Sequence, residues 1–167
     1  GGCQLQHVVY EEQLRQKQLI LQDALSRIGK LPGLSIPPVI PSPQPYGYRQ
    51  VLRMGIGERS EGWFLGFFES GSQRLFPVET CFLVSESFRN TIDQLGKRLQ
   101  MIPLQPQFLA NVEIRWSALE QKYVLIFQGK STDEREVSRV FDAFADLGDV
   151  QGFVCGVVAL SASLPAH

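Results

Sequence analysis

The residues best suited to do chemistry in this sequence are its three cysteines, Cys3, Cys81 and Cys155. Cys3 follows Gly1 and Gly2, and a Gly-Gly-Cys turn is typical of a thiolate brought up to a metal, because glycine lets the backbone approach closely. A metal site needs several ligands, so this opening suggests one part of a longer motif. An odd number of cysteines without a C-x-x-C pair argues against a secreted disulfide scaffold.

Other catalytic chemistry has little support in the sequence. It has no P-loop, no glycine-rich dinucleotide motif, no H-E-x-x-H and no G-x-S-x-G. His7 and His167 are the only histidines, so a nucleophile activated by histidine has almost no base to use. We interpret His7 as a structural histidine and Cys155, within GFVCGVV, as a small buried hydrophobe.

The elements that would position the cysteines begin with a helix predicted over residues 9–28. Its apolar stripe is expected to be Leu14, Leu21, Leu25 and Ile28, and its other face to carry Arg15, Gln18 and Gln22. Residues 32–45 then hold six of the ten prolines. Proline is excluded from helix interiors and central strands, so this segment is predicted to be an extended connector.

From Tyr46 onward, short aromatic and branched segments predict strands. YRQVLRMGIG, GWFLGFFE and QRLFPVE suggest an antiparallel meander, and NVEIRWSA with KYVLIFQG suggests a hairpin that turns near Leu119 and Glu120. VQGFVCGVVAL is expected to be a last, fully apolar strand. These strands would supply the sheet of the domain.

Two helices are predicted between the strands. One covers residues 86–100, with Ser85 as its N-cap, and the other lies within STDEREVSRVFDAFADLG, with Ser131 and Glu134 at capping-box spacing and Gly148 at its end. The expected fold is therefore α+β, an antiparallel or mixed sheet with helices packed on it, in the order α-β-β-β-α-β-β-α-β.

Several segments resemble the bacterial RNA uracil-C5 methyltransferases of the TrmA/RumA type. They are GGCQLQHVVYEEQLRQKQ, PYGYRQVLR and GFFESGSQRLFPVETC, and they occur in the order found in that family. The resemblance covers most of the chain and is carried by motifs up to Cys81, and by the pattern of elements beyond it.

The resemblance implies a 4Fe-4S cluster in the intact protein. Cys3 matches the third cysteine of the motif C-x5-C-G-G-C, and Cys81 matches a distant fourth ligand. A cluster of this kind takes four thiolates. The two earlier cysteines are not in this sequence, so the cluster is not expected in this chain alone.

The resemblance also implies that this is the central part of a larger enzyme. The family's N-terminal barrel and its C-terminal methyltransferase domain, which binds S-adenosylmethionine and carries the catalytic residues, are not expected in this sequence. By itself the chain is predicted to be inactive. It is divided into a cluster loop and first helix (1–31), the connector (32–45) and an RNA-binding region (46–164), which forms one domain with 1–31.

The residues expected to bind RNA are Tyr48, Arg49, Arg53, Phe67 and Arg74. Arginine suits phosphate, and aromatic faces stack on splayed bases of single-stranded RNA. Arg49 and Arg53 are four residues apart, so on one strand they would share a face. For Phe67, a place on this face and a place in the core are equally expected. Lys97 and Arg98 are interpreted as a solvated helix end.

The formal net charge of −1 over 167 residues gives no basic excess that would indicate non-specific nucleic-acid binding. No apolar run approaches the length that spans a bilayer. The expected protein is a cytoplasmic monomer that binds rRNA or tRNA and no membrane. Two alternatives stay open, a non-catalytic module that binds RNA or protein and a structural iron-sulfur domain without RNA contact.

Overall fold

The computed structural model describes residues 4–103, 108–129, 133–148 and 150–157, the last segment as backbone alone beyond Val150. Contacts divide the chain into two compact units, Gly1–Pro45 and Tyr46–His167, which are described separately. The division falls where the proline-rich connector was predicted to end. A single domain of residues 1–31 with residues 46–164 stays a prediction. No helix in the described segments is both long and apolar enough to cross a membrane.

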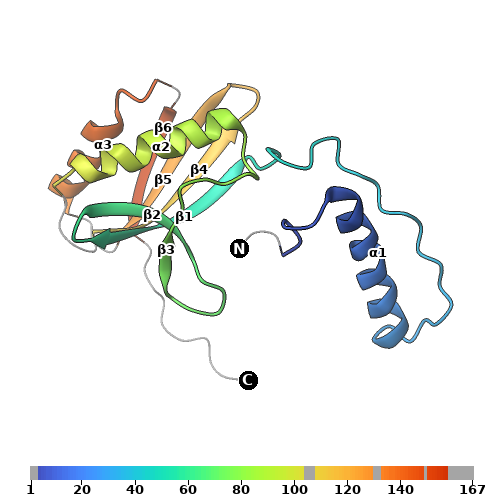
Figure 1. Ribbon diagram of the computed structural model, residues 1–167. Coiled ribbons are helices and arrows are strands. Elements are labelled where there is room, and N and C mark those ends of the chain that lie inside the picture. The colour runs from blue at the N-terminus through green and yellow to red at the C-terminus, as the bar shows by residue number, and fades with distance from the viewer. Residues whose placement is uncertain (1–3, 104–107, 130–132, 149, 158–167) are drawn as a thin grey trace. The chain divides into compact units, whose positions relative to one another are not determined.

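The first unit consists of α1 (Tyr10–Arg27) and the connector (Figure 1). The helix confirms the prediction, and two residues of its predicted polar face bind the connector. Gln18 Nε2 donates to the carbonyl of Ile36 at 2.8 Å, and Gln22 Nε2 donates to that of Leu34 at 2.7 Å. Prolines leave a connector poor in backbone donors, so its carbonyls take their hydrogen bonds from glutamine side chains.

The second unit is built on a six-stranded mixed sheet in the order β3-β2-β1-β4-β5-β6. The strands are β1 (Val51–Arg59), β2 (Gly62–Phe68), β3 (Leu75–Pro77), β4 (Leu109–Ser117), β5 (Lys122–Gly129) and β6 (Val150–Val157). All neighbours pair antiparallel except β5 and β6, which are parallel. The predicted meander, hairpin, final strand and α+β order are confirmed.

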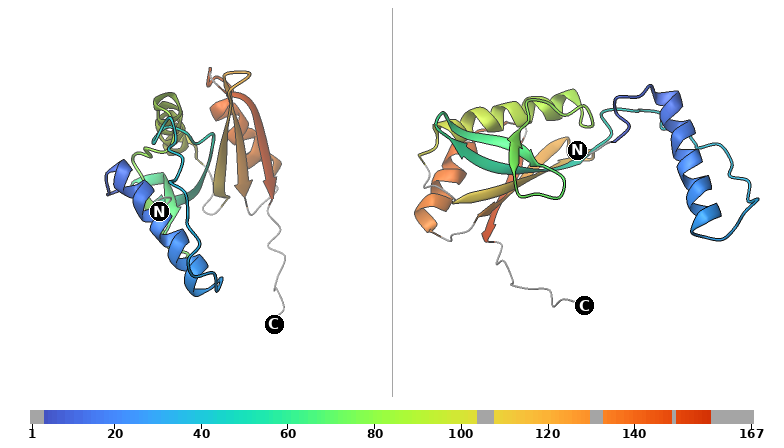
Figure 2. Two further views of the ribbon diagram at one scale, coloured as in Figure 1. Left: turned by 90° about the vertical axis from the view of Figure 1, so that its right-hand side faces the viewer. Right: turned by 60° about the horizontal axis from the view of Figure 1, so that its bottom comes forward.

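Helices α2 (Glu86–Met101) and α3 (Glu134–Phe144) pack beside each other on one face of this sheet (Figures 1 and 2). Ser85 caps α2 as predicted, because its Oγ accepts from the Phe88 N–H at 3.2 Å. The predicted start of α3 is wrong. The helix is capped by Asp133, whose carboxylate accepts from the Arg135 N–H at 2.9 Å, and a carboxylate there also suits the helix dipole. Ser131 lies outside the described residues.

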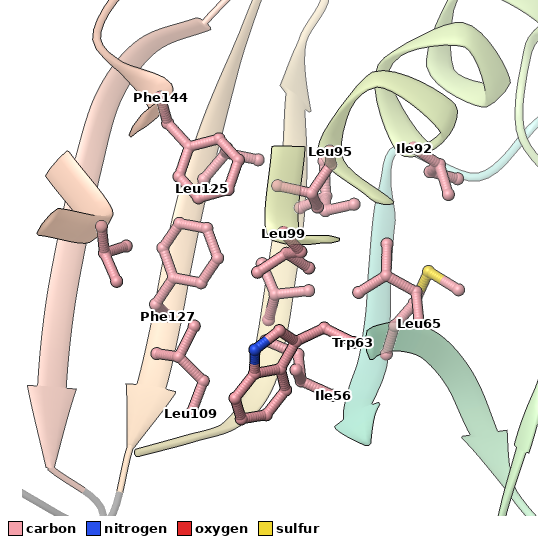
Figure 3. Packing of buried hydrophobic residues seen from close by; sticks show 14 of the residues in the cluster. Ile56, Trp63, Leu65, Ile92, Leu95, Leu99, Leu109, Leu125, Phe127 and Phe144 are labelled. Carbon is pink, nitrogen blue, oxygen red and sulfur yellow. The ribbon is translucent and has the colours of Figure 1, made fainter. Parts of the chain in front are cut away.

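The hydrophobic core fills the space between the helices and this face of the sheet (Figure 3). Alternate strand residues such as Leu52, Met54 and Leu125 point into it and are almost fully buried. Phe127 of β5 and Phe144 of α3 stack with their ring centroids 5.1 Å apart.

Arg98 joins the two helices by donating to the Ala143 carbonyl at 2.8 Å. The prediction of a solvated helix end is therefore wrong for this residue.

Candidate nucleic-acid interface

The sheet face opposite α2 and α3 carries a row of charged side chains, since alternate residues of each strand point away from the core. Arg53 of β1 pairs directly with Glu113 of β4, and Arg115 lies two residues further along β4. The Glu113 carboxylate accepts hydrogen bonds from the Nε atoms of both arginines. Its side chain is 7% exposed, against 77% for Arg53 and 54% for Arg115. One buried acid therefore holds two exposed guanidinium groups.

The environment of Glu113 lowers the pKa of its carboxyl. Burial raises this pKa, but the hydrogen bonds from Arg53 and Arg115 and the positive charges of both arginines outweigh burial. Glu113 is therefore ionised as the counter-charge of the arginine pair. The whole group carries a net positive charge.

Glu113 should make the free energy of unfolding depend on pH. Because its pKa is lower in the folded than in the unfolded chain, its ion pairs stabilise the fold above the ordinary value of 4.5. That stabilisation is lost as the pH falls through the folded pKa. We expect Glu113→Gln to be less stable than the unsubstituted chain near neutral pH, and the difference in urea unfolding to shrink below pH 4.5. Glu58→Gln, at an exposed acid of β1, is the control; an equal pH-dependent difference there would contradict the prediction.

A pocket of about 250 Å³ lies beside Arg53 on the same face. Gly55 and Gly66, which pair across β1 and β2, contribute backbone without side chains. A Cβ on Gly55 would lie 3.1 Å from the Phe68 ring and 2.5 Å from Leu75 Cδ1. The absence of a Cβ on Gly55 therefore lets Phe68 and Leu75 pack closely over β1. Asn111 and Gln128, which pair across β4 and β5, line another part of the pocket.

The predicted RNA-binding residues occupy different places in the structure. Arg53 lies on the open sheet face, but Arg49 precedes β1, and its N–H donates to the Leu83 carbonyl at 2.8 Å. The argument that Arg49 and Arg53 share a face of one strand is therefore wrong, because the chain changes partners from residues 82–84 to β4 between them. Tyr48, in the same approach to β1, is 51% exposed.

The aromatic residue on the face of Arg53 is Phe68. Phe67 packs against the hydrophobic core, so its side chain lies on the helix-covered face. Phe68 is 48% exposed, and its ring lies over Gly55. Arg74 is exposed in the turn between β2 and β3, where its N–H donates to Ser72 Oγ at 3.1 Å. Its part in RNA binding stays a prediction.

Cys81 is a half-buried free thiol between β3 and α2 that packs against the core. Its loop is fixed by the Gly47 N–H, which donates to the Phe82 carbonyl at 3.0 Å. Cys3 lies outside the described residues. Within the described segments, His, Cys, Asp and Glu form no group of three or more that could hold a metal ion. One thiolate does not meet the requirement of a 4Fe-4S cluster, so these residues alone do not form such a site.

Five residues of the open face were not predicted as site residues from the sequence: Phe68, Asn111, Glu113, Arg115 and Gln128. A signal for four of them was present. In NVEIRWSA, polar residues alternate with apolar ones. This alternation predicts that Asn111, Glu113 and Arg115 share the face that points away from the core. Gln128 follows from the same alternation in KYVLIFQG.

Comparisons with known proteins give relatives for most of the chain, although no family model matches it. The 23S rRNA (uracil(1939)-C(5))-methyltransferase of Nitrosospira multiformis is 30% identical over 155 residues, 92% of this chain and 35% of that protein. An uncharacterised RNA methyltransferase of Aquifex aeolicus is 32% identical over 85% of this chain and 32% of its own length. Another, from Halalkalibacterium halodurans, is 39% identical over 57% of this chain and 21% of its own.

A solved structure shares the fold. The tRNA (uracil-54, C5)-methyltransferase of Pyrococcus abyssi, in complex with S-adenosyl-L-homocysteine, matches with a TM-score of 0.70 and 20% sequence identity. The match covers 98% of this chain and 38% of that protein. At this identity it is evidence for the fold alone.

The relatives place the chain among the RNA methyltransferases. More particularly, it belongs to the RNA uracil-C5 methyltransferase family, and it corresponds to a part of the family's members. The matches cover between 21% and 35% of the length of these three curated relatives. The expected resemblance to this family is confirmed.

Proposed function

We propose that this chain is the central RNA-binding part of an S-adenosylmethionine-dependent RNA (uracil-C5-)-methyltransferase that acts on rRNA or tRNA. The observation that carries the proposal is the 30% identity, over 92% of the chain, to a 23S rRNA uracil methyltransferase. Another part of the protein supplies the methyl donor site and the catalytic residues. The part described here positions the RNA.

Arg53 and Arg115 are the residues of this chain best placed to contact RNA phosphates. Their guanidinium groups are exposed and are held side by side through Glu113. An ordered guanidinium loses less conformational entropy when it binds, so its position favours contact with the RNA backbone. The uridine to be methylated must leave its stack to be reached, and contacts with flanking nucleotides would hold the strand while it does so.

RNA affinity tests this role. We expect Arg53→Ala to weaken binding of an rRNA fragment and to reduce the slope of log affinity against log salt by about 0.7, the value for one lost single-strand phosphate contact. Arg135→Ala removes the same charge from an exposed position on α3 and is the matched control. Equal effects of the two variants, or none, would contradict the proposed binding face.

Methyl transfer tests the activity. The protein of full natural length should transfer labelled methyl groups from S-adenosylmethionine to C5 of uridine in rRNA or tRNA transcripts. Arg53→Ala in that protein should lower kcat/KM more than Arg135→Ala does. RNA binding without any methyl transfer would instead support a non-catalytic binding module.

The family resemblance also supports Cys3 and Cys81 as two of four ligands of a 4Fe-4S cluster in the intact protein. Cys81 is half-buried and therefore partly accessible as a ligand. We expect anaerobically purified full-length protein to contain about four irons per chain, and Cys81→Ser to lose them. Cys155→Ser is the control, since Cys155 has no counterpart among the expected ligands. Iron content unchanged by Cys81→Ser would contradict this assignment.

A further inference from the structure

We infer that the pocket beside Arg53 binds one unstacked nucleotide of single-stranded RNA, with its base on Phe68 and its phosphate at the arginine pair. The inference rests on the proposed RNA-binding function and assigns it a particular subsite. The pocket occupies the open face of the sheet, and its lining includes Arg53, Gly55, Gly66, Phe68, Asn111, Gln128 and the acid Glu113.

The shape of the pocket suits a flat ring. Because Gly55 and Gly66 have no Cβ, Phe68 and Leu75 lie close against the strands, and the Phe68 ring offers a flat wall to a planar group. Its volume of about 250 Å³ is enough for a nucleobase with part of its sugar.

Phe68 is the stacking surface that is still free. The neighbouring ring on this face, Phe64, is covered by the Arg59 guanidinium, which lies 4.6 Å from the ring centroid. This contact shows that a planar, polar group already stacks on an aromatic ring here. Phe68 is 48% exposed and, among the described residues, has no such partner. Bases stack on aromatic rings of this kind in single-stranded RNA complexes.

Asn111 and Gln128 supply the polar contacts for a base edge. They face each other across β4 and β5, and both are half-buried. Within the described segments, neither side-chain amide has a hydrogen-bond partner. Each amide offers a donor and an acceptor, and the edge of a uracil or another base presents the same combination.

The arginine pair supplies the charge for the phosphate. Both guanidinium groups bind Glu113 through Nε, and in the described part of the chain their terminal Nη atoms make no hydrogen bond. Two cations with one buried counter-charge leave an excess positive charge beside the pocket. Glu113 also lines the pocket, but its carboxylate is bound to both arginines, so we assign it a positioning role.

The test measures binding of a short fluorescent oligouridine to the full chain by anisotropy. We expect Phe68→Ala to raise Kd by about tenfold, within the range for loss of one base stack. Phe68→Trp should retain affinity, and the double variant Asn111→Ala with Gln128→Ala should weaken it. Phe76→Ala is the matched control, because Phe76 is 40% exposed on the neighbouring strand and pairs with Phe67, on the other face. Circular dichroism melts confirm that each variant is folded.

Photo-crosslinking identifies the contact directly. Oligouridine carrying one 5-iodouridine should crosslink to the peptide that contains Phe68, and the crosslink should disappear in Phe68→Ala. If the unsubstituted chain binds RNA and the pocket variants bind equally well, the inference is wrong, the proposed function stands, and a polypeptide segment becomes the better candidate occupant. If the unsubstituted chain binds no RNA, both the inference and the RNA-binding role are wrong.

Discussion

Replacing Phe127 by alanine is expected to lower the free energy of unfolding by about 3–5 kcal/mol, the usual cost of removing a buried phenylalanine. Phe127 is 0% exposed and stacks on Phe144, so its ring joins β5 to α3 at the centre of the core (Figure 3). The remaining cavity would lie between a central strand and a helix, where neighbouring side chains can collapse only in part. Urea unfolding followed by tryptophan fluorescence measures the change.

Phe82→Ala is the matched control for this prediction. Phe82 is 57% exposed in the loop before α2, so its truncation removes little buried surface. We expect it to change the free energy of unfolding by less than about 1 kcal/mol. A similar loss of stability in both variants would mean that Phe127 is not part of a closely packed core.

The elements of this fold could be predicted because their signals are local. The four residues Phe88, Ile92, Leu95 and Leu99 follow the helical period, and all four are buried in α2. The hairpin of β4 and β5 shows the strand period just as plainly. A helix or a hairpin forms mainly from contacts between residues that are close in sequence, so its pattern survives in one sequence.

The faces of the elements were harder to predict, because they depend on what covers them. Alternation shows that Phe67 and Phe68 lie on opposite faces, but it does not say which face the helices cover. In α1 the surroundings of the two faces differ further from the expectation. Gln18 and Gln22 were placed on the polar face, yet they bind the connector, while Leu21 is 48% exposed. A segment without strands or helices gives no periodic signal of the surface that it covers.

The candidate site was only partly predictable for a related reason. Arg53 was identified from its residue type, but Glu113 is 60 residues away in sequence and was not considered. Their contact depends on the register between β1 and β4, which is set by the whole sheet. The pocket likewise depends on two glycines on adjacent strands. Such constellations appear only when the strands are paired.

Replacing Gly66 by alanine is the second change expected to have a large effect, and it links the fold to the site. An added Cβ would collide with the backbone carbonyl of Phe76 and lie 3.1 Å from Leu75 Cγ. A backbone oxygen cannot turn aside as a side chain can, so β3 would have to shift. Overpacking of this kind costs about 1–3 kcal/mol. Since β3 has only three residues at the sheet edge, we expect it to lose its pairing first.

The consequence for binding follows from the place of Gly66 in the pocket. The added methyl group and the shifted strand would disturb Leu75 and its strand partner Phe68, on which the base is proposed to stack, so Gly66→Ala should weaken oligouridine binding as well as lower stability. Gly96→Ala in α2 is the control, because its Cβ would meet only Leu65 Cδ1, at an ordinary 4.0 Å. Alanine is favoured over glycine in a helix by roughly 0.8–1 kcal/mol, so this control should gain stability and keep its RNA affinity. If Gly66→Ala is as stable as the unsubstituted chain, the prediction is wrong. The close approach of β2 and β3 then does not require glycine at this position.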